Sequence, residues 1–334
     1  MATSSGVSVS APHSGRIRTT IGSVIRAREF GILAFLILVS ILIGMVRSTF
    51  FTPFNLLTMG RQMAELTIMG VAMTFLITSQ ELDLSVGSVY GLCALTMAFL
   101  TKNYGLDLWI SLFIVMILAV LIGLVNAFIT TRGRIPAFIV TLGTLYILRG
   151  IALVESSLPI EGPPESSFYQ ILAGKVFDIP VQIFWMVGIV LIGWFVLQRT
   201  TFGYYVRATG SNTAAAALSG INVRQVKTWC FVLTAVAACF AGALSFAHLS
   251  STSPTAGAGY ELNVIAAVVI GGTALFGGQG TVIGTFLGAA LLIVIRNGLI
   301  QIGGEGRLQE AFLGAIIIVA VLIHTHLSNR ELRR

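Results

Sequence analysis

The sequence predicts an all-α, polytopic integral membrane protein with about ten transmembrane helices. Two observations lead to this fold class. Of the 334 residues, 56% are hydrophobic and only 10% are charged, whereas soluble domains carry roughly 25% charged residues. The apolar residues also gather in runs close to the ~20 residues that a helix needs to span a bilayer. A single globular core cannot bury so much apolar surface, so lipid is the predicted solvent for most of the chain.

Apolar segments separated by polar gaps define the predicted helices. We interpret residues 1–29, which are Ser-rich and then basic, as a cytoplasmic tail, residues 30–327 as the transmembrane domain and residues 328–334 as a second cytoplasmic tail. A cleaved signal peptide is the alternative for the first segment, but no Ala-x-Ala-like site follows it, so an uncleaved helix is favoured. The predicted helices are Phe30–Val46, Gln62–Thr78, Ser85–Thr101, Leu108–Ile129, Ala137–Val154, Val181–Gln198, Thr228–His248, Glu261–Phe276, Thr281–Ile295 and Gln309–Thr325.

The charges of the gaps predict the orientation. With the N-terminus inside, basic residues gather in the inside gaps and acidic residues in the outside gaps, which is the positive-inside pattern. An even number of crossings then places both termini in the cytoplasm. The inside residues are Arg132, Arg134, Arg199, Arg207, Arg224 and Lys227, and the outside ones are Asp107, Glu155, Glu161, Glu165 and Asp178. The net charge of +7 therefore reflects orientation signals, and nucleic acid is not a predicted partner.

Two polar stretches interrupt the apolar pattern. In the basic stretch 199–227, Gly210-Ser211-Asn212 is expected to open a short Ala-rich helix that Gly220 ends, because Ser and Asn are good N-caps and Gly is common after the last turn. We expect a capped helix that projects into water to contact another protein. The acidic, proline-rich stretch 155–180 is the longest outside loop, and it is either a docking surface for an external partner or a solvated connector.

Polar residues at segment ends are candidates for a translocation path or for capping broken helices. Charges in or near lipid are costly, so Glu81 and Asp83 are expected to line a cavity or to cap a helix break. Capping of the following helix, by Asp83 or Ser85, is favoured over substrate contact. The same two roles apply to Glu261 and Asn263.

A weak internal repeat accompanies these residues. Glu81-Leu-Asp-Leu-Ser-Val is similar to Glu261-Leu-Asn-Val-Ile-Ala, and Gly123-Leu-Val-Asn126-Ala-Phe-Ile is similar to Ile295-Arg-Asn297-Gly-Leu-Ile. Such marks fit a duplicated transport core, and chance similarity between apolar segments is the alternative. Half-helices are expected among the segments that are short or interrupted by glycine, which start at Ser85, Glu261 and Thr281.

No motif for nucleotide or catalytic chemistry is present. The chain lacks a G-x-x-x-x-G-K-[ST] phosphate loop, GxSxG and HExxH. His324 and His326 lie on opposite helix faces and make a poor metal site. Gly280, Gly284 and Gly288 are interpreted as a helix-packing row. We therefore expect no catalytic residue, metal or cofactor, so an ion gradient or a separate ATPase must drive any work against a gradient.

Four stretches carry a specific resemblance. They are Glu81-Leu-Asp-Leu-Ser-Val-Gly-Ser88; Ile135-Pro-Ala-Phe-Ile-Val-Thr-Leu-Gly-Thr144 with Arg149-Gly150; Ala208-Thr-Gly-Ser-Asn212 with Ala215-Ala-Ala-Leu-Ser-Gly-Ile-Asn-Val223; and Gly259-Tyr-Glu-Leu with Ala266-Ala-Val-Val-Ile-Gly-Gly-Thr273 and Gly277-Gly-Gln-Gly-Thr281. In this order they resemble the motifs of permeases from bacterial ribose/xylose/autoinducer-2-type sugar ABC importers, within the branched-chain amino acid/sugar permease superfamily. One departure is Gln80-Glu81, where many members have Gly-Gly.

The resemblance implies a permease subunit in the bacterial inner membrane that pairs with itself or with a related permease. It implies two cytoplasmic ATP-binding cassette subunits, which hold ATP and Mg, and a periplasmic or lipid-anchored sugar-binding protein. The stretch 199–227 would then be the coupling loop that seats in the ATPase, and its implied contact residues are Thr209, Gly210, Ser211, Asn212, Ala215, Ala216 and Gly220.

Three functions remain in view. The leading hypothesis is import of a monosaccharide or related polyol, driven by separate ATPase subunits. The alternative is an ion-gradient-driven secondary transporter, in which Glu81, Asp83 and Glu261 would titrate or bind ions. An integral-membrane enzyme is disfavoured, because no nucleophile lies beside a base in a recognisable motif.

Overall fold

The computed structural model describes residues 14–303, 311 and 314–315. Twelve helices and four two-residue strands follow one another along this part of the chain, which confirms the predicted all-α fold class. The predicted helix Gln309–Thr325 and the predicted tail 328–334 extend over residues outside the described ones, as do residues 1–13 of the first tail.

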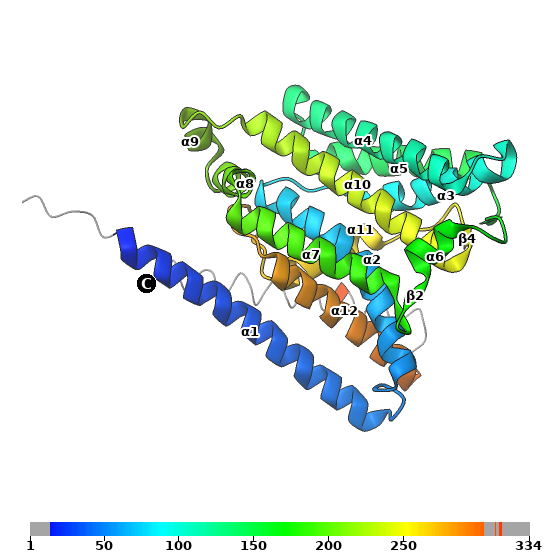
Figure 1. Cartoon of the computed structure of the whole chain (residues 1–334). Coiled ribbons are helices and arrows are strands. Elements are labelled where there is room, and N and C mark those ends of the chain that lie inside the picture. Colours follow the sequence, from blue (N-terminus) through cyan, green and yellow to red (C-terminus); the bar gives the residue numbers. More distant parts are fainter. Residues whose placement is uncertain (1–13, 304–310, 312–313, 316–334) are drawn as a thin grey trace, which may run out of the picture.

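The long helices run between two ends of the molecule (Figure 1). They are α1 Ser14–Val46, α2 Pro53–Thr78, α3 Val86–Tyr104, α4 Leu108–Gly133, α5 Ala137–Glu155, α7 Val181–Arg199, α10 Val223–Leu249 and α12 Val282–Ile302. The shorter elements are α6 Ser167–Ala173, α8 Thr201–Ser211, α9 Thr213–Leu218, α11 Tyr260–Ile270, β1 Ile160–Glu161, β2 Lys175–Val176, β3 Ile179–Pro180 and β4 Ser251–Thr252. We call the end that carries α8 and α9 the basic end, and the end that carries α6 and the strands the acidic end.

Six of the described helices are long and apolar enough to cross a membrane, namely α1, α4, α5, α7, α10 and α12. A multi-pass membrane protein is therefore confirmed. The helices α2 and α3, with 26 and 19 residues, also reach the length of a span, although α2 carries Arg61 and Glu65. The predicted total of about ten crossings stays a prediction.

Two boundaries differ from the predictions. α1 begins at Ser14, well inside the predicted tail 1–29, because no proline interrupts the helix between Ser14 and Val46. α11 ends at Ile270, so the prediction of a helix over Glu261–Phe276 is wrong for residues 271–276. Gly271 and Gly272 follow, and Gly272 has φ +90°, which ends the helix. Of the three segments considered as half-helices, only this one is short, since α3 and α12 have 19 and 21 residues.

α2 and α10 form the centre of the bundle. Every residue of α2 from Leu66 to Thr78 is buried, and α10 packs on α2, α3 and α4. A Cβ at Gly242 of α10 would overlap the backbone carbonyl of Tyr90, so glycine is what allows α10 and α3 to approach. The outer surfaces are apolar: Phe113 of α4, for example, is 67% exposed, as expected for a side chain that faces lipid.

The stretch 155–180 is folded at the acidic end. β1 pairs antiparallel with β4, with Ile160 opposite Thr252, and β2 pairs with β3. Phe168 of α6 is buried and stacks edge-on against Trp109, with ring centroids 5.2 Å apart. The stretch is therefore an ordered cap on the helices, and its role as a docking surface stays a prediction.

Candidate functional site

The predicted coupling loop contains two helices at the basic end. The Thr200 hydroxyl caps α8 by accepting a hydrogen bond from the Gly203 N–H at 3.3 Å, and the Asn212 side chain caps α9 by accepting from the Ala215 N–H at 2.9 Å. The prediction that Gly210-Ser211-Asn212 opens the helix is thus correct only for Asn212. Gly210 and Ser211 belong to the last turn of α8.

The end of α9 follows the prediction. Gly220 has φ +84° and its N–H donates to the Ala217 carbonyl at 3.0 Å, while the Ile221 N–H donates to the Ala216 carbonyl at 3.1 Å. These two bonds form a Schellman motif, in which glycine adopts the left-handed conformation. The short helix is therefore fixed at both termini.

The structure divides the predicted coupling residues into two groups. Ser211, Asn212, Ala215 and Gly220 are exposed, whereas Thr209, Gly210 and Ala216 are buried. The buried group cannot contact a partner without rearrangement, so its role lies in packing of the loop on the helices. Leu218, which the sequence analysis did not single out, is 91% exposed at the tip of α9. The available signal was a large apolar side chain at the end of the Ala-rich segment that was predicted to project into water.

Gly210 sits where three backbones meet. A Cβ at this position would overlap the Thr78 carbonyl at the end of α2 and would lie 2.6 Å from the Gly278 nitrogen. The Gly278 N–H in turn donates to that Thr78 carbonyl at 2.9 Å. The last turn of α8, the end of α2 and the glycine-rich link 271–281 are thus in direct backbone contact. Only glycine fits such a junction.

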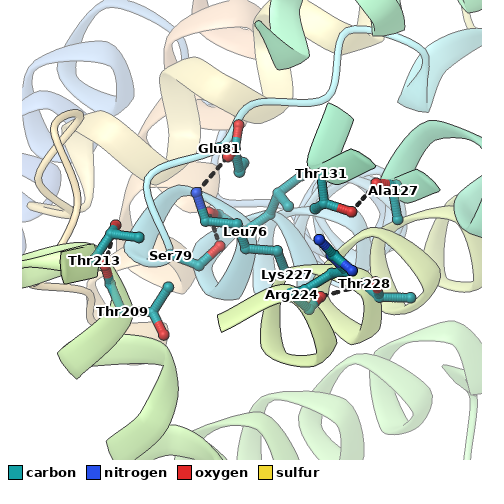
Figure 2. A network of polar contacts seen from close by, with 10 residues as sticks. All are labelled: Leu76, Ser79, Glu81, Ala127, Thr131, Thr209, Thr213, Arg224, Lys227 and Thr228. Carbon is teal, nitrogen blue, oxygen red and sulfur yellow. Dashed lines mark hydrogen bonds and ion pairs between the residues drawn. The ribbon is translucent and has the colours of Figure 1, made fainter. Parts of the chain in front are cut away.

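An ion pair lies beside this junction. Lys227 Nζ, in the second turn of α10, is 2.5 Å from Glu81 Oε1 in the link between α2 and α3. Each side chain is only 14% exposed. Figure 2 shows that Thr131, Thr213 and Thr228 bond to carbonyls four residues earlier, whereas Lys227 reaches a residue 146 positions away. The pair therefore ties the start of α10 to the end of α2.

Arg207 belongs to the same end of the bundle. Its Nη1 donates to Gln198 Oε1 at 2.9 Å, which links α8 to the end of α7. Partial burial lowers the pKa of the Arg207 guanidinium from its ordinary value, since desolvation disfavours the charged form. The hydrogen bond from Arg207 thus holds α8 against the end of α7.

Asp83 and Ser85 form the helix break in a way that differs from the expected cap. The buried Asp83 carboxylate accepts from the Ser85 N–H at 2.7 Å and from the Ser85 hydroxyl at 2.5 Å. Ser85 is the N-cap of α3, but neither side chain bonds to the first N–H groups of that helix. The predicted cap is therefore wrong in detail. The pair instead continues into the core, where Asn126 donates to Ser85 and Thr144 donates to Asn126 at 3.1 and 2.6 Å.

Glu261 occupies a different setting from Glu81. It lies in the first turn of α11, pairs with Arg149 of α5 at 3.5 Å and packs against the backbone of Gly87 at the start of α3. Asn263 follows in the next half-turn, where its N–H donates to the Gly259 carbonyl at 3.3 Å. Glu81 thus lies in the link between two long helices, whereas Glu261 lies in the first turn of a short one, and the internal repeat stays a prediction.

The glycine row lies where helices approach closely. Gly280 precedes α12 and faces the Thr78 hydroxyl, while Gly284 and Gly288 within α12 face the backbone carbonyls of Gly271 and Ala267. A Cβ at each of the three would overlap its neighbour. The row therefore brings α12 against α11 and the end of α2.

Residues 55–321 match the family described as "Branched-chain amino acid transport system / permease component". The chain belongs to this permease family. It is 37% identical over 320 residues to the ribose import permease protein of Haemophilus influenzae, which covers 92% of this chain and 96% of the relative. It is 38% identical to the ribose import permease protein of Escherichia coli, over 80% of this chain and 84% of the relative.

A third relative is named for the import of a different sugar. The permease is 34% identical to the fructose import permease protein of Rhizobium meliloti, over 75% of this chain and 72% of the relative. No solved structure matches the chain. Among the described residues, no group of three or more His, Cys, Asp or Glu side chains could hold a metal ion.

Sequence analysis missed a polar cluster halfway along α2. Tyr90 of α3 donates to Glu65 of α2 at 2.8 Å, and Arg61 of α2 lies 2.7 Å from His248 of α10. Two charged residues at i and i+4 inside an apolar segment were the available signal. They went unnoticed because the predicted helix was placed to begin at Gln62 rather than at Pro53.

Proposed function

We propose that this permease is the membrane-spanning subunit of a bacterial ABC importer that translocates a monosaccharide or a related polyol. In this assignment it resides in the cytoplasmic membrane with both termini in the cytoplasm. Family membership supports transport rather than catalysis, and the relatives named for ribose and fructose import support a sugar as cargo. Loop charges support the orientation.

One observation carries the mechanical part of this assignment. The doubly capped helix α9 is exposed at the basic end, and the residues that flank it are tied to α2 and α10 through the Gly210 junction and the Lys227–Glu81 pair. A displacement of α9 would therefore be passed to two central helices. We infer that α9 is the coupling helix, and that an ATPase seated on it moves the bundle between its access states.

The assignment requires partners. Two cytoplasmic ATP-binding cassette subunits would hold ATP and Mg and would contact Ser211, Asn212, Ala215, Leu218 and Gly220. A second permease, identical or related, would complete the pathway, and a periplasmic or lipid-anchored binding protein would deliver the sugar at the acidic end. The ordered cap formed by 155–180 supports such a delivery surface, because a loop that is already folded loses little conformational entropy when the binding protein docks on it.

The ion-gradient alternative has less support. Each of its candidate ion-binding carboxylates already has one oxygen engaged, since Glu81 pairs with Lys227, Glu261 pairs with Arg149, and Asp83 Oδ1 accepts two bonds from Ser85. A carboxylate paired with a cation is a poor ligand for a second cation, because the ion must first displace the existing partner.

Reconstitution separates the two functions. The purified permease is placed in vesicles with or without its co-purified ATPase, with the binding protein on the opposite face, and uptake of labelled ribose and fructose is measured. We expect uptake only with the ATPase and ATP. Uptake driven by a proton or sodium gradient without the ATPase would contradict the assignment and support the secondary transporter.

A further inference from the structure

The half of α2 nearest the acidic end carries an unusual polar face. Thr58 lies three and four residues before Arg61 and Gln62, and Glu65 lies four and three residues after them, so the four side chains share one face of the helix. We call these four residues the outer polar stripe. The half of α2 beyond them is entirely buried from Leu66 to Thr78.

The stripe is open to the surface along its length. Gln62 is exposed, and Thr58, Arg61 and Glu65 are half-buried. In hydrocarbon a partly exposed carboxylate and guanidinium are costly, so such residues face a water-filled path or another protein. Exposed side chains on α4, such as Ile110, Phe113 and Leu121, are apolar instead. The polar stripe of α2 is therefore turned away from lipid.

Polar side chains from other helices face the stripe. His248 of α10 contacts Arg61, and Tyr90 of α3 donates to Glu65. The Ser245 hydroxyl and the Tyr260 phenol also face the Glu65 carboxylate, and the Tyr90 and Tyr260 rings lie 5.0 Å apart. Side chains from three other helices, α3, α10 and α11, thus surround one carboxylate of α2.

The line of polar groups continues beyond Glu65 toward the middle of the bundle. Tyr260 is followed in the chain by Glu261, which pairs with Arg149 across to α5. Arg61 Nε and Glu261 Oε2 are buried and have no hydrogen-bond partner within the described part of the chain. One is a donor and the other an acceptor, and buried polar atoms of both kinds call for a partner that can serve both roles.

A polyhydroxy compound is such a partner. Each sugar hydroxyl both donates and accepts, a carboxylate only accepts, a guanidinium only donates, and tyrosine rings offer apolar faces beside their phenols. An inorganic ion fits less well, because the line carries both carboxylates and cations and so has no single sign of charge.

We propose that the outer polar stripe, with His248 and Tyr260, contacts the hydroxyl groups of the sugar during translocation, with Glu65 as the main acceptor and Arg61 as the main donor. This assignment rests on the proposed function, since the sugar supplies the hydroxyls. The stripe lies on the acidic half of the bundle, so it acts before the cargo passes the Lys227–Glu81 level.

Transport per ATP tests the role of Glu65. The complete importer, reconstituted in vesicles with its ATPase and binding protein, is compared as wild type, Glu65→Gln and Asp107→Asn, with labelled ribose and fructose as probes. Asp107 is the matched control, because its carboxylate also accepts a hydrogen bond, from the Trp109 N–H at 2.8 Å, but lies outside both the stripe and the cap 155–180. We expect Glu65→Gln to lower the sugar moved per ATP by about ten-fold, the scale of one charged hydrogen bond, and Asp107→Asn to leave it near wild type. Equal ratios for both variants would overturn the proposal.

Thiol labelling tests whether the stripe faces water, and it does so independently of transport. Gln62→Cys places a thiol in the stripe, and Leu56→Cys places one outside it, about 120° away around α2. The native Cys93, Cys230 and Cys239 are buried. A water-soluble thiol reagent should modify Gln62→Cys but not Leu56→Cys, and sugar delivered by the binding protein should slow the reaction. An unreactive Gln62→Cys, or one that forms a disulfide with a second copy, would place the stripe in a protein contact and overturn the proposal. Wild type that moves neither sugar while Gln62→Cys reacts would count against the proposed cargo and leave the polar path supported.

Discussion

The two ends of the bundle are held together by different kinds of contact. At the basic end, α8, α2 and the link 271–281 meet backbone to backbone, and a largely enclosed ion pair lies beside them. Toward the acidic end, polar side chains of α2 meet those of α3 and α10, and Arg61 and Glu65 stay half-buried. Backbone contacts pass on displacement, because close-packed atoms have no room to yield. Side-chain contacts can be exchanged for contacts with a ligand. The basic end is thus suited to transmitting a displacement to the helices, and the outer half is suited to the passage of a ligand.

Removing one partner of the Lys227–Glu81 ion pair should have the largest effect at the basic end. Lys227→Ala leaves the Glu81 carboxylate largely enclosed without a cation, and loss of one partner of a buried pair costs about 3–5 kcal/mol. We expect a fall in unfolding temperature in detergent and a loss of sugar uptake per ATP. The charge exchange Lys227→Glu with Glu81→Lys should recover most of both. A double variant as impaired as Lys227→Ala would show that the pair does not act as a pair.

Adding a single methyl group to the junction should have the next largest effect. Gly210→Ala places a Cβ against the Thr78 carbonyl, and overpacking of this kind costs about 1–3 kcal/mol. Gly188→Ala in α7 is the matched control, because a Cβ there meets nothing within 4 Å. Thermal unfolding in detergent compares the two. Equal unfolding temperatures would contradict the tight junction.

The exposed tip of α9 should matter for association and not for stability. Leu218→Ala removes an apolar side chain that is 91% exposed, and truncating a central contact residue costs about 2 kcal/mol of binding, or roughly thirty-fold in affinity. Affinity for the ATPase is measured with the permease in detergent. Leu158→Ala, at the acidic end and 73% exposed, serves as the control. Equal affinities for both variants would remove α9 from the ATPase contact.

Loss of the α9 cap should give the smallest effect. Asn212→Ala removes the acceptor for the Ala215 N–H, which costs about 1 kcal/mol of helix stability. Affinity for the ATPase should then fall several-fold, and Asn212→Asp, which keeps the acceptor, should restore it. An Asn212→Asp variant as weak as Asn212→Ala would indicate that the amide itself contacts the partner.

Composition and apolar periodicity predicted the fold class, and the resemblance of four motifs predicted the family. Local capping rules also identified Asn212 and Gly220 as the ends of α9. They failed at Gly210, which local capping rules assign to a helix start. The structure uses it inside a helix, because Thr78 approaches from a distant part of the chain. Tertiary contact determines that position, and the local pattern carries no trace of it.

The ion pairs could not be predicted for a similar reason. Glu81 and Lys227 were each noted as charged residues, but 146 positions separate them and many other basic residues were available as partners. The apparent repeat also suggested that Glu81 and Glu261 share a role, whereas they pair with cations on different helices. Similar short sequences in apolar segments do not fix the depth at which a residue lies.

The shortness of α11 constrains how the protein is made. Its 11 residues span only about 16 Å at 1.5 Å per residue, roughly half of a bilayer core. Such a segment cannot enter the membrane as an independent span. We therefore expect residues 250–281 to be fitted against the earlier helices, with Gly257 against α3, before α12 follows and packs against Gly271. We therefore expect the bundle to assemble in a fixed order, in which its centre is complete only after α12 has been synthesised and has packed against α11.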